Sequence, residues 1–67
     1  MRVEENMENI QEELQNLLDK VHDVISCIQK IPTSPDVKDI LVEELMSVSK
    51  NLDDGITSTR KIIGYLP

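Results

Sequence analysis

Phenylalanine and tryptophan are absent from this chain of 67 residues, and Tyr65 is its only aromatic residue. A wide globular interior needs such large side chains, whereas Leu, Ile, Val and Met suffice for a narrow seam between helices. Cys27 is the only cysteine, so no disulfide can close within the chain. One cysteine and one histidine also fall short of the four ligands of a structural zinc site. We therefore expect a thin core without metal or cofactor.

Basic residues are scarce as well, since 7 Lys and Arg stand against 13 Asp and Glu and give a net charge of -6. Such a charge opposes nucleic acid phosphates and anionic lipids, so direct binding to nucleic acid or to a membrane is not expected. The chain has no basic-then-apolar leader, and its apolar runs are too short to span a bilayer. We expect a cytoplasmic protein, and the unpaired Cys27 agrees with a reducing compartment.

The first half of the chain carries a heptad repeat, in which apolar residues are spaced alternately four and three positions apart. This pattern predicts an amphipathic helix from about residue 2 to residue 31. Pro32 should end it, because proline disfavours the helical conformation of the residue before it. Position a of the repeat (row a) holds Met7, Leu14, Val21 and Ile28, and position d (row d) holds Val3, Ile10, Leu17, Val24 and Ile31.

Ser34, Pro35 and Asp36 form a start signal for a second helix, as N-cap, first helical residue and first-turn acid. We expect this helix from about residue 35 to residue 64, with Gly64 as its C-cap. Gly55 lies inside it and costs about 1 kcal/mol relative to alanine, so a kink or a close helix approach is expected there. Its apolar stripe repeats nearer to about eleven residues per three turns than to a heptad, and comprises Val37, Leu41, Leu45, Val48, Leu52, Ile56, Thr59, Ile63 and Leu66.

Only a few residues separate the two predicted helices, and short links of this kind normally join antiparallel neighbours. The predicted fold is therefore all-α, a single domain (residues 1–67) that forms an antiparallel two-helix hairpin. This pairing places Glu4, Glu5 and Glu8 beside Arg60 and Lys61. These charges are compatible with the hairpin but add little to its stability, because exposed ion pairs contribute about 0–1 kcal/mol each.

Apolar residues outside the expected seam of rows a and d predict an interaction surface. Two helices can bury one face each against the other, and the apolar arc here is wider than that. A second copy of the chain would cover the surplus and give a homodimeric four-helix bundle, and another protein could cover it instead. The predicted interface lies toward the turn and comprises Leu18 and Ile25 (row e of the first helix), Ile40, Val42 and Met46.

The first functional hypothesis is a small non-enzymatic regulatory or adaptor protein that acts through protein–protein contacts and self-association. Catalytic residues are not assigned, because the sequence holds no paired carboxylates in a recognisable pocket, no glycine-rich phosphate loop and no nucleophile with its base. A lone hairpin also lacks the concavity that a catalytic cleft needs.

Two alternatives remain open. His22 could accept a phosphoryl group as a phosphotransfer module, although a solvated surface histidine is the plainer interpretation. Cys27 is interpreted as a partly buried small hydrophobe in preference to a redox-active thiol. The second alternative is an acidic decoy that occupies the basic surface of a nucleic-acid-binding protein, although a solvated helix face is again plainer. Its contact face would be Glu4, Glu5, Glu8, Glu12 and Glu13.

Overall fold

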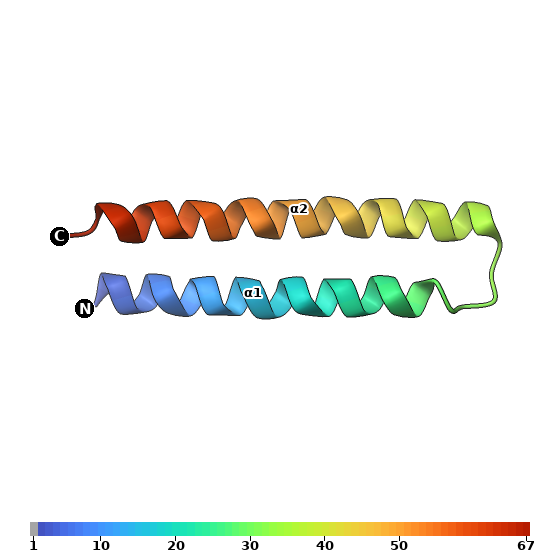
Figure 1. The fold of residues 1–67 in the computed structure, drawn as a ribbon, viewed down its shortest axis with the longest axis horizontal. Coiled ribbons are helices and arrows are strands. Elements are labelled where there is room, and N and C mark those ends of the chain that lie inside the picture. The colour runs from blue at the N-terminus through green and yellow to red at the C-terminus, as the bar shows by residue number, and fades with distance from the viewer. Residues whose placement is uncertain (1) are drawn as a thin grey trace.

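The computed structural model describes residues 2–67 as two helices, α1 (Val3–Ile28) and α2 (Pro35–Tyr65), joined by a short loop (Figure 1). The helices run antiparallel, so both chain ends lie at one end of the molecule and the loop lies at the other. The molecule is a rod of 52 × 14 × 13 Å. The predicted all-α hairpin is therefore confirmed. Met1, which belongs to the predicted domain, lies outside the described residues.

α1 ends at Ile28, a few residues before the predicted end. Beyond it the backbone tightens, because Lys30 N donates to Cys27 O and Ile31 N donates to Ile28 O, both at 3.1 Å. These bonds span three residues, as in a 3₁₀ turn. Pro32 explains the early end, since its ring disfavours a helical conformation at Ile31 and the last residues before it unwind.

α2 begins as predicted. Ser34 is its N-cap with extended backbone angles (φ -63°, ψ 145°), and its Oγ accepts a hydrogen bond from Val37 N at 3.4 Å. Pro35 follows as the first helical residue, where its missing N–H costs nothing. The loop is fastened further by Lys38 Nζ, which donates to Gln29 O at 3.1 Å. A cation therefore occupies the carbonyl end of α1, where the helix dipole favours positive charge.

The C-terminal end of α2 differs from the prediction, because the helix continues through Gly64 to Tyr65. The expected Gly64 cap is wrong. Such a cap needs a left-handed backbone conformation, and no glycine among residues 2–67 has a positive φ. Leu66 is the C-cap instead, in an extended conformation, and its N–H donates to Ile63 O at 3.2 Å.

Gly55 does not interrupt α2, which is helical on both sides of it. The hydroxyl of Thr59 donates to Gly55 O at 2.7 Å within the same helix. Gly55 also faces α1, since a Cβ built on it would lie 3.5 Å from Leu14 Cδ1. Because an added Cβ would sit at ordinary van der Waals distance, the space at Gly55 does not require a glycine, and the helices do not approach unusually closely there.

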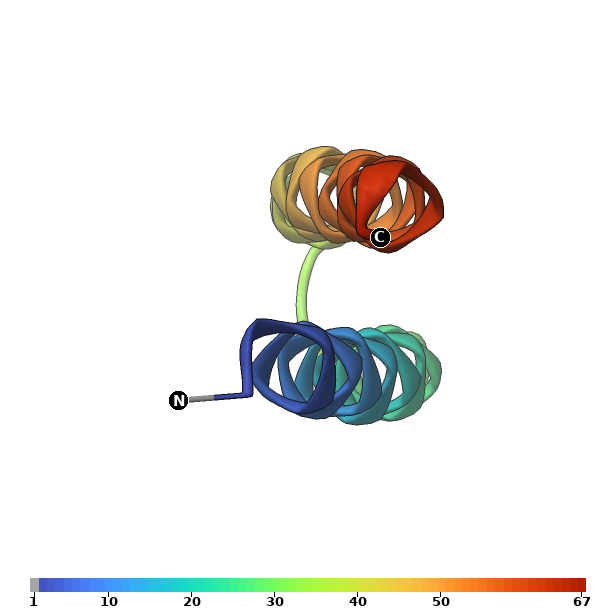
Figure 2. The same cartoon turned by 90° about the vertical axis from the view of Figure 1, so that its left-hand side faces the viewer.

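The two helices lie side by side (Figure 2), and the core of the molecule is one narrow seam between them. Within the described part of the chain, four residues are buried: Leu18, Ile28, Ile56 and Thr59. Ile56 is the most enclosed apolar residue, with 3% of its surface exposed. The seam residues of α1 are Met7, Gln11, Leu14, Leu18, Val21, Ile25 and Ile28, and those of α2 with its C-cap are Lys38, Val42, Leu45, Ser49, Leu52, Ile56, Thr59, Ile63 and Leu66, with Gly55 half-buried beside them.

This seam joins row a with row e, so the predicted pairing of row a with row d is wrong. Leu18 in row e is 9% exposed, whereas its neighbour Leu17 in row d is 49% exposed. Row a lies between the other two rows, and a heptad repeat is therefore compatible with either pairing. The expected stripe of α2 is corrected in the same way. Its seam follows a strict heptad, and Leu41 and Val48 lie outside it.

Candidate functional site

Exposed apolar side chains form a line along each helix, and together these lines contain most of the exposed large apolar residues of the described chain. In α1 the line is row d. In α2 a matching line of Leu41, Val48 and Ile62 is spaced by heptads and interrupted at Gly55, and Val37 lies one turn before Leu41, outside this spacing. Each side chain is between 41% and 49% exposed. We call this set the apolar flank, and it comprises Val3, Ile10, Leu17, Val24, Ile31, Val37, Leu41, Val48 and Ile62.

Both lines lie on the same face of the hairpin. In each helix the exposed line comes three positions after a seam row, as Leu17 follows Leu14 and Val48 follows Leu45. The exposed line is therefore rotated away from the seam in the same sense in both helices. In an antiparallel pair of right-handed helices, equal rotation from the seam leads to the same face. The apolar flank is thus continuous, with the seam along its middle.

The opposite face is polar. His22 Nε2 and Ser49 Oγ are 3.3 Å apart and hydrogen-bond across the two helices. Lys50 and Asp53 line the same depression, together with Leu18 and Met46. We call this face the polar flank, and it carries Glu8, Gln15, His22, Met46, Asp53 and Arg60.

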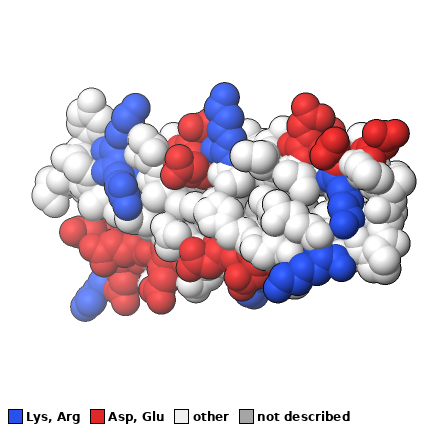
Figure 3. Space-filling model, turned by 45° about the vertical axis from the view of Figure 1, so that its right-hand side comes forward, with Lys and Arg blue, Asp and Glu red and all other residues white. Residues whose placement is uncertain are grey.

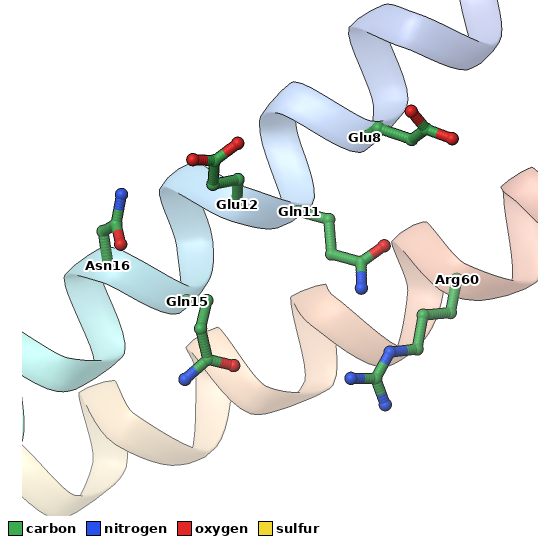
Figure 4. A pocket seen from close by; sticks show the side chains of 6 residues that line it. All are labelled: Glu8, Gln11, Glu12, Gln15, Asn16 and Arg60. Atoms are coloured by element: carbon green, nitrogen blue, oxygen red, sulfur yellow. The ribbon is translucent and has the colours of Figure 1, made fainter.

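A second depression lies on the polar flank nearer the chain ends (Figure 4). Gln11 and Gln15 point from α1 toward α2, whereas Glu12 and Asn16 point away from the seam. Arg60 lines the depression from α2. The residues that line this depression from both helices are polar, which is consistent with the apolar flank lying on the opposite face.

The five predicted interface residues do not form one exposed patch. Leu18 is buried and Ile25 and Val42 are half-buried in the seam, so these three side chains hold the hairpin together. Ile40 and Met46 are exposed, at 60% and 61%. They lie apart, because Met46 borders the depression on the polar flank and Ile40 lies on the side of α2 opposite the seam. The cause is the shift of the seam by one row.

The five glutamates of the predicted acidic face are all exposed but do not share one face. Glu8, which was predicted to lie beside Arg60, lines the same depression as that residue, and so does Glu12, for which no such proximity was predicted. Glu13 lies on the other side, where it borders Leu17 of the apolar flank. Figure 3 shows acidic side chains gathered over the N-terminal half of α1, with basic side chains of α2 alongside.

Interhelical ion pairs do not hold the hairpin together. The structure contains, over residues 2–67, a single ion pair, between Arg2 Nη1 and Glu5 Oε2 at 3.8 Å within α1. Both side chains are more than half exposed, so the pair adds little stability.

Cys27 is exposed, so the prediction that it is partly buried is wrong. The shifted seam explains this, because row d now separates Cys27 from α2. His22 is exposed, as expected for a surface histidine, and its bond to Ser49 ties it to the other helix. Its use as a phosphoryl acceptor stays a prediction.

No cluster of three or more His, Cys, Asp or Glu side chains suited to a metal ion occurs in the described range. Neither α1 nor α2 combines the length and the apolar character that a membrane span requires. Comparisons with protein-family models, curated proteins and solved structures found no match for this chain. Function is therefore inferred from the two flanks of the hairpin.

Proposed function

We propose that this chain is a small non-enzymatic adaptor or regulatory protein that binds other proteins through its apolar flank, and that its first partner is a second copy of itself. The supporting observation is the continuity of the flank over the length of the rod. Between its two lines lie only seam residues, of which Lys38 alone is charged. Contiguous apolar surfaces of this kind mark interaction sites in soluble proteins.

The size of the apolar flank fits this function. Nine side chains that are each almost half exposed present roughly 700 Å² of apolar surface, close to the ~800 Å² that each partner contributes to a standard interface. Two hairpins joined in this way form a four-helix bundle, with the seams and flanks of both copies in one interior. The thin core of the hairpin would then become an ordinary core.

Sedimentation equilibrium tests the proposal directly. The chain has a mass of 7.6 kDa, and the wild type should sediment at twice this mass. Leu17→Glu combined with Val48→Glu places charge in the middle of the apolar flank and should give a monomer. The matched control is Ser26→Glu with Ser47→Glu, because both residues are exposed and lie outside the flank. A monomeric wild type at high concentration would show that self-association is not its function.

The acidic decoy remains the alternative, but the structure favours it less because its five glutamates lie on both sides of α1. Salt distinguishes the two proposals. Decoy binding should weaken steeply as ionic strength rises, whereas apolar association should be unchanged or strengthened. Our proposal also includes a reducing cytoplasmic setting, in which the exposed thiol of Cys27 stays reduced.

A further inference from the structure

We infer that the second copy covers the apolar flank with its loop at the opposite end of the bundle, so that each helix packs antiparallel against the same helix of the other copy. The inference rests on the self-association proposed above. Two arrangements with two-fold symmetry would cover the flank. With both loops at one end, α1 would lie on α2 of the second copy. With the loops at opposite ends, α1 would lie on α1.

Charges at the border of the apolar flank favour the second arrangement. Glu13 and Lys20 are one heptad apart on α1 and line a shallow depression with Leu17 and Asn16. They lie on either side of Leu17 along the outer edge of row d. When a second α1 crosses antiparallel with Leu17 over Leu17, Glu13 of each copy lies beside Lys20 of the other. The two-fold axis repeats this contact, which gives two ion pairs at the border.

With both loops at one end, the border of α1 would instead face the border of α2 at the same level along the rod. Leu14 and Gly55 set this level, because a Cβ at Gly55 would lie 3.5 Å from Leu14 Cδ1. Glu13 would then meet Ser58, and Lys20 would meet Asn51. Neither partner is charged, so the two ion pairs would be lost.

The interruption of the flank at Gly55 does not distinguish the two arrangements, because Val48 of the second copy would lie against it in one and Leu17 in the other. The overall charge distribution favours loops at opposite ends. The N-terminal half of α1 carries the glutamates of the acidic run (Figure 3). Loops at opposite ends place the two acidic halves at opposite ends of a rod 52 Å long, where their repulsion is screened.

A distance between the loops tests the arrangement. Thr33→Cys in a Cys27→Ser background provides one exposed thiol per copy for a spin label. Pulsed electron paramagnetic resonance should give a separation close to the 52 Å length of the rod. Labels within roughly 20 Å, about two helix spacings, would overturn the arrangement while leaving self-association intact. If sedimentation shows that the labelled chain is monomeric, both this arrangement and the proposed function fail.

Charge reversal provides a second test. Lys20→Glu replaces the ammonium group beside Glu13 by a carboxylate, twice in each dimer, and should weaken the dimer by about tenfold or more at low salt. Lys50→Glu changes the net charge equally but lies on the polar flank, so it should have little effect. Adding Glu13→Lys to Lys20→Glu should restore the dimer. Equal effects of Lys20→Glu and Lys50→Glu, or no rescue by the double change, would refute the paired border.

Discussion

Two consecutive leucines should have opposite roles, and their replacement by alanine tests the seam. Leu18 is 9% exposed between the helices, whereas Leu17 is 49% exposed on the apolar flank. Leu18→Ala should destabilise each hairpin at every protein concentration. Leu17→Ala should mainly weaken the dimer, so that its effect on unfolding grows with protein concentration.

The expected magnitudes follow from burial. Replacement of a buried leucine by alanine costs about 2–5 kcal/mol, and we expect about 2–3 kcal/mol for Leu18 because the seam is open on both sides and can partly close. Only about half of the Leu17 surface is buried in the isolated hairpin, so its replacement by alanine should lower the free energy of unfolding there by about 1 kcal/mol. A chain of this size is stable by only about 3–10 kcal/mol. The Leu18 change should therefore be plainly visible.

Urea unfolding followed by far-ultraviolet circular dichroism measures both changes. Each variant is compared at a low concentration, where the proposed dimer should be dissociated, and at a high concentration. If Leu17→Ala costs as much as Leu18→Ala at the low concentration, rows a and d form the seam after all and the assigned flank is wrong.

Three further changes test local features of the hairpin. Ser34→Ala removes the acceptor of Val37 N and should cost about 1 kcal/mol, seen as a fall in the melting temperature of about 4–8 °C; an unchanged melting temperature would contradict the cap. Ile56→Ala should cost about 2–5 kcal/mol in urea unfolding, and a loss below that of an exposed residue would place the core elsewhere. Thr59→Val should change stability by less than about 1 kcal/mol in the same assay, because Gly55 O keeps its helical N–H donor. A larger loss would show that the hydroxyl bond itself holds this turn.

Local signals predicted the two helices well, because the residues that set them act within one turn. Ser34 and Pro35 define the start of α2 by capping and ring geometry. Pro32 ends α1 indirectly, through Ile31, so the end point depended on how far the helix unwound. The prediction of Gly64 as the C-cap of α2 failed for a different reason, because a glycine permits a left-handed cap but does not require one.

The rotation of the helices about their axes was not predictable from α1 alone. Rows d and e both adjoin row a, and the heptad repeat is satisfied by either choice. The sequence of α2 leaves the same choice, since the row of Leu45 and Leu52 is adjoined by Val48 on one side and Ile56 on the other. The structure buries Leu18 and Ile56 and leaves Leu17 and Val48 exposed. Because of this rotation, three of the five predicted interface residues, Leu18, Ile25 and Val42, lie in the seam, and whether any surface binds a partner stays a prediction.

Both termini leave the rod at the end remote from the loop. A hairpin built in this way can be inserted into an exposed turn of a carrier protein, since entry and exit points lie near each other. It would then project as a stiff arm with the loop at its tip. The same feature sets where a fluorescent or affinity tag can be attached, because a tag at either terminus lies away from the loop of its own chain, although in the inferred dimer it would lie near the loop of the second copy.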